Sequence, residues 1–286
     1  SRQAKGQAIV NLLQLQEDER VTSMLKTGEK FSGQSLVMAT TKGTIKKTPV
    51  EDFKNVRKSG LIAIKLRAGD SLEWVKECSK DNEVVMVTKE GKCIRFNEKD
   101  ARDMGRASIG VRGMKLRSGD EVVQMDTVQD PEESELLVIM ENGLGKMTKI
   151  QDYRLQSRGG TGVKTANITS KTGKIVGATV IAKDTDADLI MMSKSGVVIR
   201  LHAQQIPSQG RATQGVYLMR MKPNDKVAST SLIAHASEEE IEKSQEEAEK
   251  AQKISKKAQP ELLDETEEVN TEEEKPKKSK KATTAK

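Results

Sequence analysis

Apolar and polar residues alternate in a segment that recurs five times along the chain, each time directly after a glycine. The copies are separated by 54, 50, 52 and 53 residues. In every copy the fifth residue after the glycine is polar and both its neighbours are apolar, as in Met114-Lys115-Leu116. Alternation with a period of two is typical of a β-strand that buries one face. The five repeat glycines are Gly6, Gly60, Gly110, Gly162 and Gly215.

Each repeat also contains a short apolar run that leads into a polar turn with a glycine, followed by a second short run. A run of this kind, such as residues 84–87 before Gly91, predicts a buried central strand that turns back in a hairpin. A further short strand is expected between the two glycine series, for example at residues 122–128. The hairpin glycines are Gly43, Gly91, Gly143 and Gly196.

Four short strands in a repeat of roughly fifty residues is the arrangement found in propeller blades. No helical period occurs in residues 1–234. A β-sandwich is the alternative, but a sandwich does not require an internal repeat. The sequence therefore predicts an all-β, propeller-like array of four-stranded blades over residues 1–234, with repeats starting near residues 6, 60, 110, 162 and 215.

The pattern stops after Leu232, and residues 235–286 form a charged tail that is first acidic and then rich in lysine. Glu–Lys pairs at helical spacing accompany a thin apolar face, so we expect this tail to be weakly helical or disordered. Residues 237–286 carry 15 acidic and 11 basic residues, against 28 acidic and 38 basic ones in residues 1–236. A basic body indicates a polyanionic partner, nucleic acid first.

The composition narrows the class of protein further. The chain holds one Trp, two Tyr and three Phe, so its core must consist of Val, Ile, Leu and Met. Cys78 and Cys93 suit neither a disulfide framework nor a metal site, which favours a reducing compartment. The chain has no apolar run of membrane length and no recognisable signal peptide, so we expect a cytoplasmic location and no membrane partner. Because the chain does not begin with Met and opens in mid-pattern, we expect a piece of a longer protein.

An arginine precedes each repeat glycine by four residues, or by three in one copy. The same charge at the same corner between blades predicts a stripe of cations around the array. Lys5, Lys58 and Lys164 stand close to these arginines, and short loops with glycine allow a phosphate to approach the backbone. The predicted DNA-binding residues of this series are Arg2, Arg57, Arg106, Arg158 and Arg211, together with Gly159, Gly160 and Gly162.

A second basic series follows the hairpin glycines. Charges on a rim suit a ligand that follows a curved path, and duplex DNA is the candidate. The alternative is a solvated charged face with turn-forming glycines. No series of aromatic residues accompanies the cations, which disfavours recognition of single strands or RNA. The residues of this second series are Lys46, Lys47, Arg95, Lys146 and Arg200.

Catalytic and metal-binding interpretations find little support in the sequence. His202 and His235 are the only histidines, and no cysteine lies at ligand spacing from either. Residues 143–148, GLGKMT, resemble the end of a phosphate-binding loop, but Met147 stands where Ser or Thr belongs. The three aspartates of residues 184–188 lack the glycine and the closing glutamate of a calcium loop. We therefore expect no catalytic residue, no metal site and no cofactor here.

With these segments in view, the chain resembles the C-terminal DNA-wrapping domain of the bacterial DNA gyrase A protein over about residues 2–234. The resemblance rests on the repeat and on strings such as KGQAIVNLLQLQEDERVTSML, ATTKGTIKKT, EGKCIRF and IGVRGMKLRSGDEVV. It implies a six-bladed β-pinwheel that exchanges strands between blades and bends duplex DNA around a positive perimeter. It also implies a non-catalytic part of an ATP-dependent type II topoisomerase that introduces negative supercoils. The implied partners are the N-terminal region of gyrase A and the gyrase B protein, in an A2B2 assembly, with ATP and Mg acting there.

Two features depart from the family's pattern. Its signature heptapeptide, Gln-Arg-Arg-Gly-Gly-Lys-Gly, belongs to the first blade, most of which is expected to be missing here. Residues 156–162, QSRGGTG, keep five of its seven residues in a later blade. Neither Tyr153 nor Tyr217 has the context of the family's catalytic tyrosine, which lies upstream. Two other interpretations stay open: the corresponding C-terminal domain of topoisomerase IV, and a protein-binding propeller.

Overall fold

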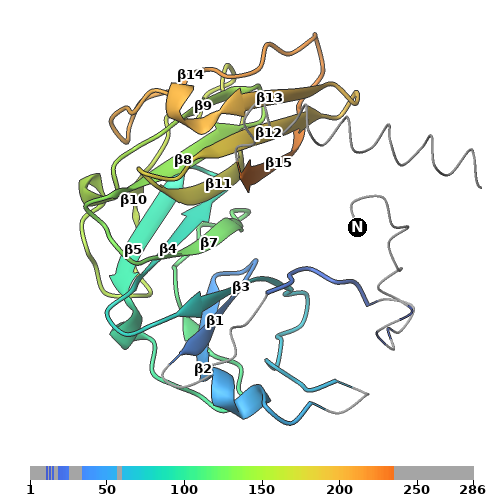
Figure 1. Ribbon diagram of the computed structural model, residues 1–286, viewed down its shortest axis with the longest axis vertical. Coiled ribbons are helices and arrows are strands. Elements are labelled where there is room, and N and C mark those ends of the chain that lie inside the picture. Colours follow the sequence, from blue (N-terminus) through green and yellow to red (C-terminus); the bar gives the residue numbers. More distant parts are fainter. Residues whose placement is uncertain are drawn as a thin grey trace, which may run out of the picture. The chain divides into compact units, whose positions relative to one another are not determined.

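Four antiparallel hairpins organise the chain (Figure 1). The structure is a computed structural model that describes residues 11, 13, 15, 19–25, 34–56 and 60–234. The hairpins pair β1 (Ser35–Thr40) with β2 (Thr44–Pro49), β4 (Glu83–Thr88) with β5 (Lys92–Asn97), β8 (Ser134–Met140) with β9 (Leu144–Lys146), and β12 (Ala187–Ser193) with β13 (Val198–His202). Their turn glycines, Gly43, Gly91, Gly143 and Gly196, have φ values of 80–84°. The predicted central strands and hairpins are confirmed.

A further strand completes the opposite edge of each hairpin. β3 (Leu72–Cys78), β7 (Val122–Val128), β11 (Ile175–Ala182) and β15 (Val227–Ala234) pair with β1, β4, β8 and β12. Asp126 on β7 links three of these edge strands: its carboxylate lies 3.0 Å from Lys76 Nζ on β3 and accepts a hydrogen bond of 3.1 Å from the Val180 amide on β11.

The fourth strand of a sheet comes from the stretch of chain that builds the next sheet. β6 (Val111–Arg112), β10 (Val163–Lys164) and β14 (Val216–Tyr217) directly follow repeat glycines and pair with β2, β5 and β9 of the preceding sheet. The sheet orders are β3-β1-β2-β6, β10-β5-β4-β7, β11-β8-β9-β14 and β13-β12-β15. Among the described residues, β13 has no fourth strand beside it. The exchange of strands agrees with the β-pinwheel that the resemblance implies.

Each exchanged strand needs glycine before it because the chain crosses the preceding hairpin at close range. Gly110, Gly162 and Gly215 have φ values of 93°, 67° and 77°. A Cβ at these positions would lie 2.5–2.6 Å from the carbonyl oxygen of Ile45, Cys93 or Gly145. Only two residues then pair in each exchanged strand, so these strands are shorter than the alternation predicts.

A short 3₁₀ turn follows the second strand of every hairpin: η2 (Val50–Phe53), η3 (Glu98–Asp100), η4 (Ile150–Asp152) and η5 (Ala203–Gln205). An apolar residue at or just after each turn packs inward, and Tyr153 is fully buried. Its hydroxyl group lies 2.5 Å from that of Thr165, which leaves the phenol hydrogen-bonded and inaccessible.

Three mainly aliphatic cores lie between consecutive sheets. Alternate residues of one central strand serve two of them: on β4, Val84 and Met86 pack toward the first sheet, and Val85 and Val87 toward the third. Both faces of β4 and β8 are therefore largely buried, which explains their continuous apolar runs. No helix among the described residues is long and apolar enough to span a membrane. The tail at 235–286 lies outside the described residues.

Candidate nucleic-acid interface

The chain turns between successive sheets at three corners, residues 105–110, 157–162 and 210–215, each directly before an exchanged strand. Arg106, Arg158 and Arg211 occupy equivalent positions in these corners and are half-buried. The structure thus places three arginines of the first predicted series at equivalent sites. The other members, Arg2 and Arg57, lie outside the described residues, as do Lys5 and Lys58.

The guanidinium groups of two corner arginines also hold the protein together. Arg158 donates from Nε to the Asp100 carbonyl oxygen at 2.7 Å and from Nη1 to that of Arg112 at 3.1 Å. Arg211 donates from Nη1 to the Lys164 carbonyl oxygen at 3.4 Å, and its guanidinium lies 6.0 Å from the centre of the Tyr153 ring. Each arginine therefore ties its corner to the preceding exchanged strand, a role that the sequence did not indicate.

The glycines of the middle corner differ from one another. Gly159 has φ +81°, and its amide donates to the Gly113 carbonyl oxygen at 2.6 Å. Gly162 has φ +67° and lies against Cys93. Gly160 lies outside the positive-φ region, and a Cβ there would meet nothing closer than 3.5 Å. Two of the three glycines are therefore required by the fold itself, whatever approaches the corner from outside.

The prediction of an exposed second basic series is wrong for Lys46 and Lys146, which are fully buried. Lys46 Nζ donates to the carbonyl oxygens of Ala63, at 2.5 Å, and Arg106. Lys146 Nζ donates to the carbonyl oxygens of Gly210 and Arg211 at 2.6 and 2.7 Å, and lies 3.1 Å from Thr213 Oγ1. The ammonium groups face the underside of a corner, where a phosphate has no access.

The side chains of Lys47 and Arg95 are also mostly covered and paired within the protein, so the prediction of exposed rim charges is wrong for them as well. Lys47 forms an ion pair with buried Glu98. Arg95 forms a two-bond ion pair with buried Glu83 and donates to the carbonyl oxygens of Ile150 and Tyr153 at 3.1 and 2.9 Å. Arg200 is exposed but pairs with the buried carboxylate of Asp188.

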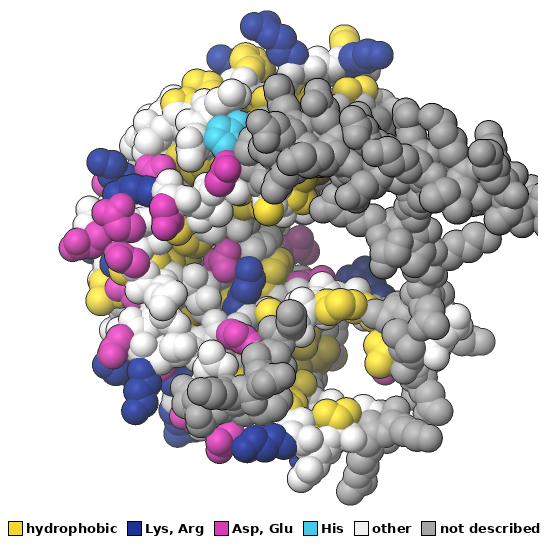
Figure 2. Space-filling model, in the orientation of Figure 1, with side chains coloured by type: hydrophobic (Ala, Val, Ile, Leu, Met, Phe, Trp, Pro, Cys, Tyr) yellow, Lys and Arg dark blue, Asp and Glu magenta, His cyan; other side chains and the backbone are white. Residues whose placement is uncertain are grey.

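Exposed cations do recur at equivalent positions, but mostly at residues outside the two predicted series. Arg112 and predicted Lys164 are the second residues of successive exchanged strands, and Tyr217 takes this place in the third. Figure 2 shows Lys and Arg side chains spread over the surface among Asp and Glu rather than gathered in a pocket. The sequence contained a signal for one group of these cations, those five residues after a repeat glycine, because the alternation marks that position as polar. Other exposed cations in equivalent places are Lys54, Arg102 and Arg154 after the 3₁₀ turns, Lys65, Lys115 and Arg220 five residues after a repeat glycine, and Arg67, Arg117 and Lys222 seven residues after it.

The residues considered for catalysis or metal binding are engaged in protein contacts. His202 Nδ1 lies 3.3 Å from Asp188 Oδ1, and Asp188 also pairs with Arg200. Residues 143–148 form the hairpin turn and β9, not a phosphate-binding loop. Within the described part of the chain, no group of three or more His, Cys, Asp or Glu side chains is placed to hold a metal ion.

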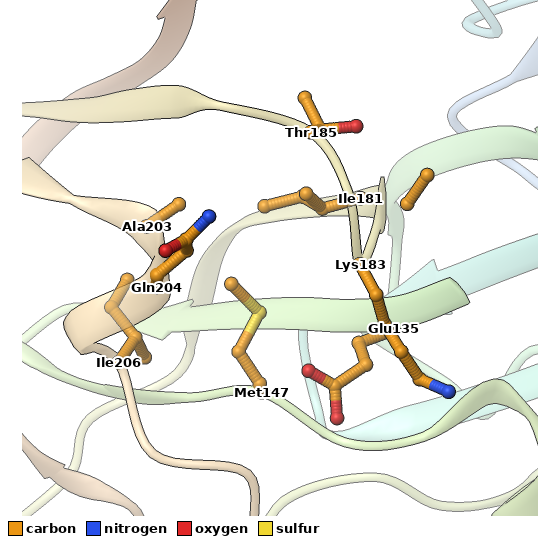
Figure 3. Close-up of a pocket in the computed structure, with 9 residues that line it drawn as sticks. Glu135, Met147, Ile181, Lys183, Thr185, Ala203, Gln204 and Ile206 are labelled. Atoms are coloured by element: carbon orange, nitrogen blue, oxygen red, sulfur yellow. The ribbon is translucent and has the colours of Figure 1, made fainter. Parts of the chain in front are cut away.

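A cavity of about 200 Å³ lies between the ends of β8 and β11 and η5 (Figure 3). Ile181 and other apolar side chains form part of its wall. Its charged groups are used within the protein: Glu135 accepts a hydrogen bond from Ser208, and Lys183 pairs with Glu133. The cavity therefore presents apolar surface with engaged charges, not a convergent set of ligand-binding groups.

Comparisons with known proteins place this architecture in a family. A family model described as "DNA gyrase C-terminal domain, beta-propeller" matches residues 1–27, 34–79, 82–129, 134–182 and 187–234. The DNA gyrase A protein of Staphylococcus aureus strain MRSA252 is 38% identical over 243 residues, 85% of this chain and 27% of that protein. The protein of strain NCTC 8325 is 38% identical over 241 residues, 84% of this chain and 27% of its own length. The chain thus spans about a quarter of these relatives.

Solved structures agree with this assignment. The C-terminal domain of DNA topoisomerase IV superposes with a TM-score of 0.74 at 22% identity, over 85% of this chain and 75% of that one, a likeness that concerns the fold alone. The DNA gyrase A C-terminal domain superposes with a TM-score of 0.69 at 29% identity, over 81% of this chain and 76% of that one.

Proposed function

The chain belongs to the DNA gyrase C-terminal domain family, and from this membership we propose that it binds and bends duplex DNA without sequence preference along its outer surface. The observation that carries the proposal is the recurrence of exposed cations on and after successive exchanged strands, such as Arg112, Lys115 and Lys164. Because the repeat sets their spacing, a duplex that follows the sheets meets a similar group of charges at each corner.

The chemistry of these groups supports contacts to phosphate rather than to bases. Lys and Arg side chains neutralise phosphates and release counterions, which supplies affinity without reading sequence. The described residues contain no α-helix that could enter the major groove. They also carry few exposed aromatic side chains, and Tyr217 is the one at an equivalent position of an exchanged strand. Bending arises when the duplex keeps contact with successive corners.

In the larger enzyme, the bent duplex would be wrapped so that one segment is presented for passage through another. We propose that this domain supports ATP-dependent negative supercoiling in that way, as a part without catalytic residues or a cofactor. The N-terminal region of gyrase A and the gyrase B protein, in an A2B2 assembly, would supply strand cleavage and the sites for ATP and Mg. The proposed location is the cytoplasm, where bacterial DNA is held.

The proposal is tested by measuring affinity for a labelled duplex of about 30 base pairs at several salt concentrations. If six to ten phosphates are contacted, binding weakens by roughly 10³–10⁵-fold between about 50 and 200 mM salt. Duplexes of unrelated sequence are the matched controls and give the same curve. A flat salt profile, or strong preference for one sequence, contradicts the proposal.

Wrapping is measured separately from binding. A closed circular plasmid is relaxed by a topoisomerase I while the chain is bound, and the change in linking number is read after the protein is removed. A shift that grows with the amount of bound protein supports wrapping. Binding with no shift shows that the duplex is not wrapped with a net handedness.

A further inference from the structure

Two buried lysines occupy the same place in two different sheets. Lys46 and Lys146 are each the third residue after a hairpin glycine. Both ammonium groups donate to the main-chain carbonyl oxygen of the corner arginine that the next repeat brings over the sheet, Arg106 or Arg211. The contacts bridge 60 and 65 residues of sequence. The arrangement is thus repeated, and each copy holds the backbone of a corner that carries an arginine.

The corners above the two lysines fold alike. Their sequences are GRASIG at 105–110 and GRATQG at 210–215. In both, the Ser or Thr hydroxyl donates to the carbonyl oxygen of the first glycine, Ser108 to Gly105 at 2.8 Å and Thr213 to Gly210 at 2.9 Å. The turn directs main-chain carbonyl oxygens inward, where they accept hydrogen bonds from the lysine ammonium group.

The middle corner provides a natural comparison because it lacks the lysine. Ile94 stands at the equivalent position of the second sheet, beneath the corner SRGGTG at 157–162. A Cβ at Gly160 would lie 3.5 Å from Ile94 Cδ1, so this corner rests on an apolar side chain. Its arginine, Arg158, is held instead through its own guanidinium group on two carbonyl oxygens.

A buried ammonium group without a carboxylate hydrogen-bond partner is unfavourable for the fold. The three acceptors of Lys146 are neutral oxygens. An apolar side chain such as methionine could fill a similar volume without the desolvation cost of the charge. The lysine therefore contributes by fixing the backbone of the corner. Its ammonium group holds the main-chain carbonyl oxygens of Gly210 and Arg211, on either side of the Arg211 side chain.

We infer that Lys46 and Lys146 are positioning residues for DNA, each holding the corner arginine of the next repeat where it meets the phosphate backbone. The inference rests on the proposed function, and it replaces direct phosphate contact as the role of these two lysines. Lys146 acts on DNA through Arg211, and Lys46 acts through Arg106.

Neighbouring charges make the same contact sensitive to protons. Burial and, to a smaller extent, the charge of Arg211 in the corner above together lower the pKa of Lys146 to about 8, and Asp152 on η4 opposes the shift. The pKa of Lys46 is lowered too, chiefly by burial, with Asp52 on η2 opposing. A phosphate beside Arg211 favours the protonated lysine, so binding takes up a proton. Affinity therefore falls as the pH rises through about 8.

The first experiment uses the protein without DNA. Trypsin cleaves after arginine, and the rate of cleavage after Arg211 in the folded chain is followed by mass spectrometry. In Lys146→Met the cleavage is about tenfold faster, because the corner loses charge-assisted hydrogen bonds. Ile94→Met is the matched control, with no change at Arg158. An unchanged rate after Arg211 in Lys146→Met overturns the inference and leaves the proposed function standing.

The second experiment is a double-mutant cycle on DNA binding. Lys146→Met and Arg211→Ala each reduce the slope of log affinity against log salt by about one unit, and the double variant loses no more than either single variant. Additive losses mean that the lysine acts independently of Arg211 and overturn the inference. If Lys146→Met does not fold, Lys46→Met with Arg106→Ala provides the same cycle. If the wild-type chain binds no DNA, the proposed function fails, while the trypsin result still reports on the corner.

A pH series separates positioning from a general loss of stability. Wild-type affinity declines between about pH 7 and pH 9, and the decline is absent in Lys146→Met measured at the same salt. An equal decline in both proteins assigns it to another group and counts against Lys146.

Discussion

Adding one methyl group at Gly162 tests whether the repeat glycines are required by strand exchange. The residue has φ +67°, and an alanine Cβ would lie 2.5 Å from the Cys93 carbonyl oxygen and 2.8 Å from the Cys93 carbonyl carbon. The left-handed conformation costs an alanine about 1–2 kcal/mol. Displacing a hairpin backbone in a packed structure costs about 1–3 kcal/mol more. Gly162→Ala should therefore destabilise the domain by about 2–5 kcal/mol.

The assay is thermal unfolding by calorimetry or circular dichroism, without DNA. For a domain of this size each kcal/mol corresponds to roughly 2–4 °C, so the midpoint should fall by roughly 4–20 °C. Gly160→Ala is the matched control because it makes the same chemical change two residues away. Its Cβ meets nothing closer than 3.5 Å, and its φ lies outside the positive region.

The two variants separate the reasoning from its alternatives. Gly160→Ala should leave the midpoint unchanged or raise it slightly, since alanine restricts the unfolded chain. If Gly162→Ala unfolds within about a degree of the wild type, the close crossing over Cys93 does not constrain the chain. If both variants lose the same stability, the corner is sensitive to any side chain, and the argument from φ and distance is refuted.

Two further predictions concern the cations. Replacing both Arg112 and Lys164 by Ala should lower the salt slope of DNA binding by about two units. The melting temperature should change little, because both side chains are exposed. An unchanged slope means that DNA follows another path. Arg95→Met should lower the melting temperature clearly, because it leaves the buried carboxylate of Glu83 without its ion pair. Its salt slope, measured on the folded fraction, should match that of the wild type, and a slope lowered by one unit would restore Arg95 as a phosphate contact.

The hairpins and their repeat could be predicted from the sequence because their signals are local. Residues 84–87 are apolar without interruption, and a polar turn with Gly91 follows directly. Such a run has few alternatives once it recurs every fifty residues or so. Strand exchange had no local signal. The alternation around Lys115 predicts a half-buried strand but does not say which sheet receives it, and the pairing is only two residues long.

The error over Lys46 and Lys146 has a similar origin. A lysine near a hairpin turn is usually at the surface. Here it is covered by a corner that lies 60 or more residues later in the chain. Lys47 is buried and Arg95 is largely covered, and they pair with buried Glu98 and Glu83, partners that no short-range pattern marks. The sequence could therefore indicate where cations recur, but not which of them reach solvent.

Strand exchange bears directly on how such a surface could bend DNA. Smoothly bending a site of 20–30 base pairs costs about 1–6 kcal/mol, so the contacts must hold their spacing against the recoil of the duplex. A loop that carries its cation on free backbone would yield to that force. Lys164 instead lies on β10, which comes from the stretch of chain that builds the third sheet and is hydrogen-bonded to β5 of the second sheet. The next corner holds the same residue through the bond from Arg211 to its carbonyl oxygen. Its position is thus fixed by the stretches of chain that build three successive sheets, so the force from a bent duplex is passed to the packed sheets rather than to a flexible rim.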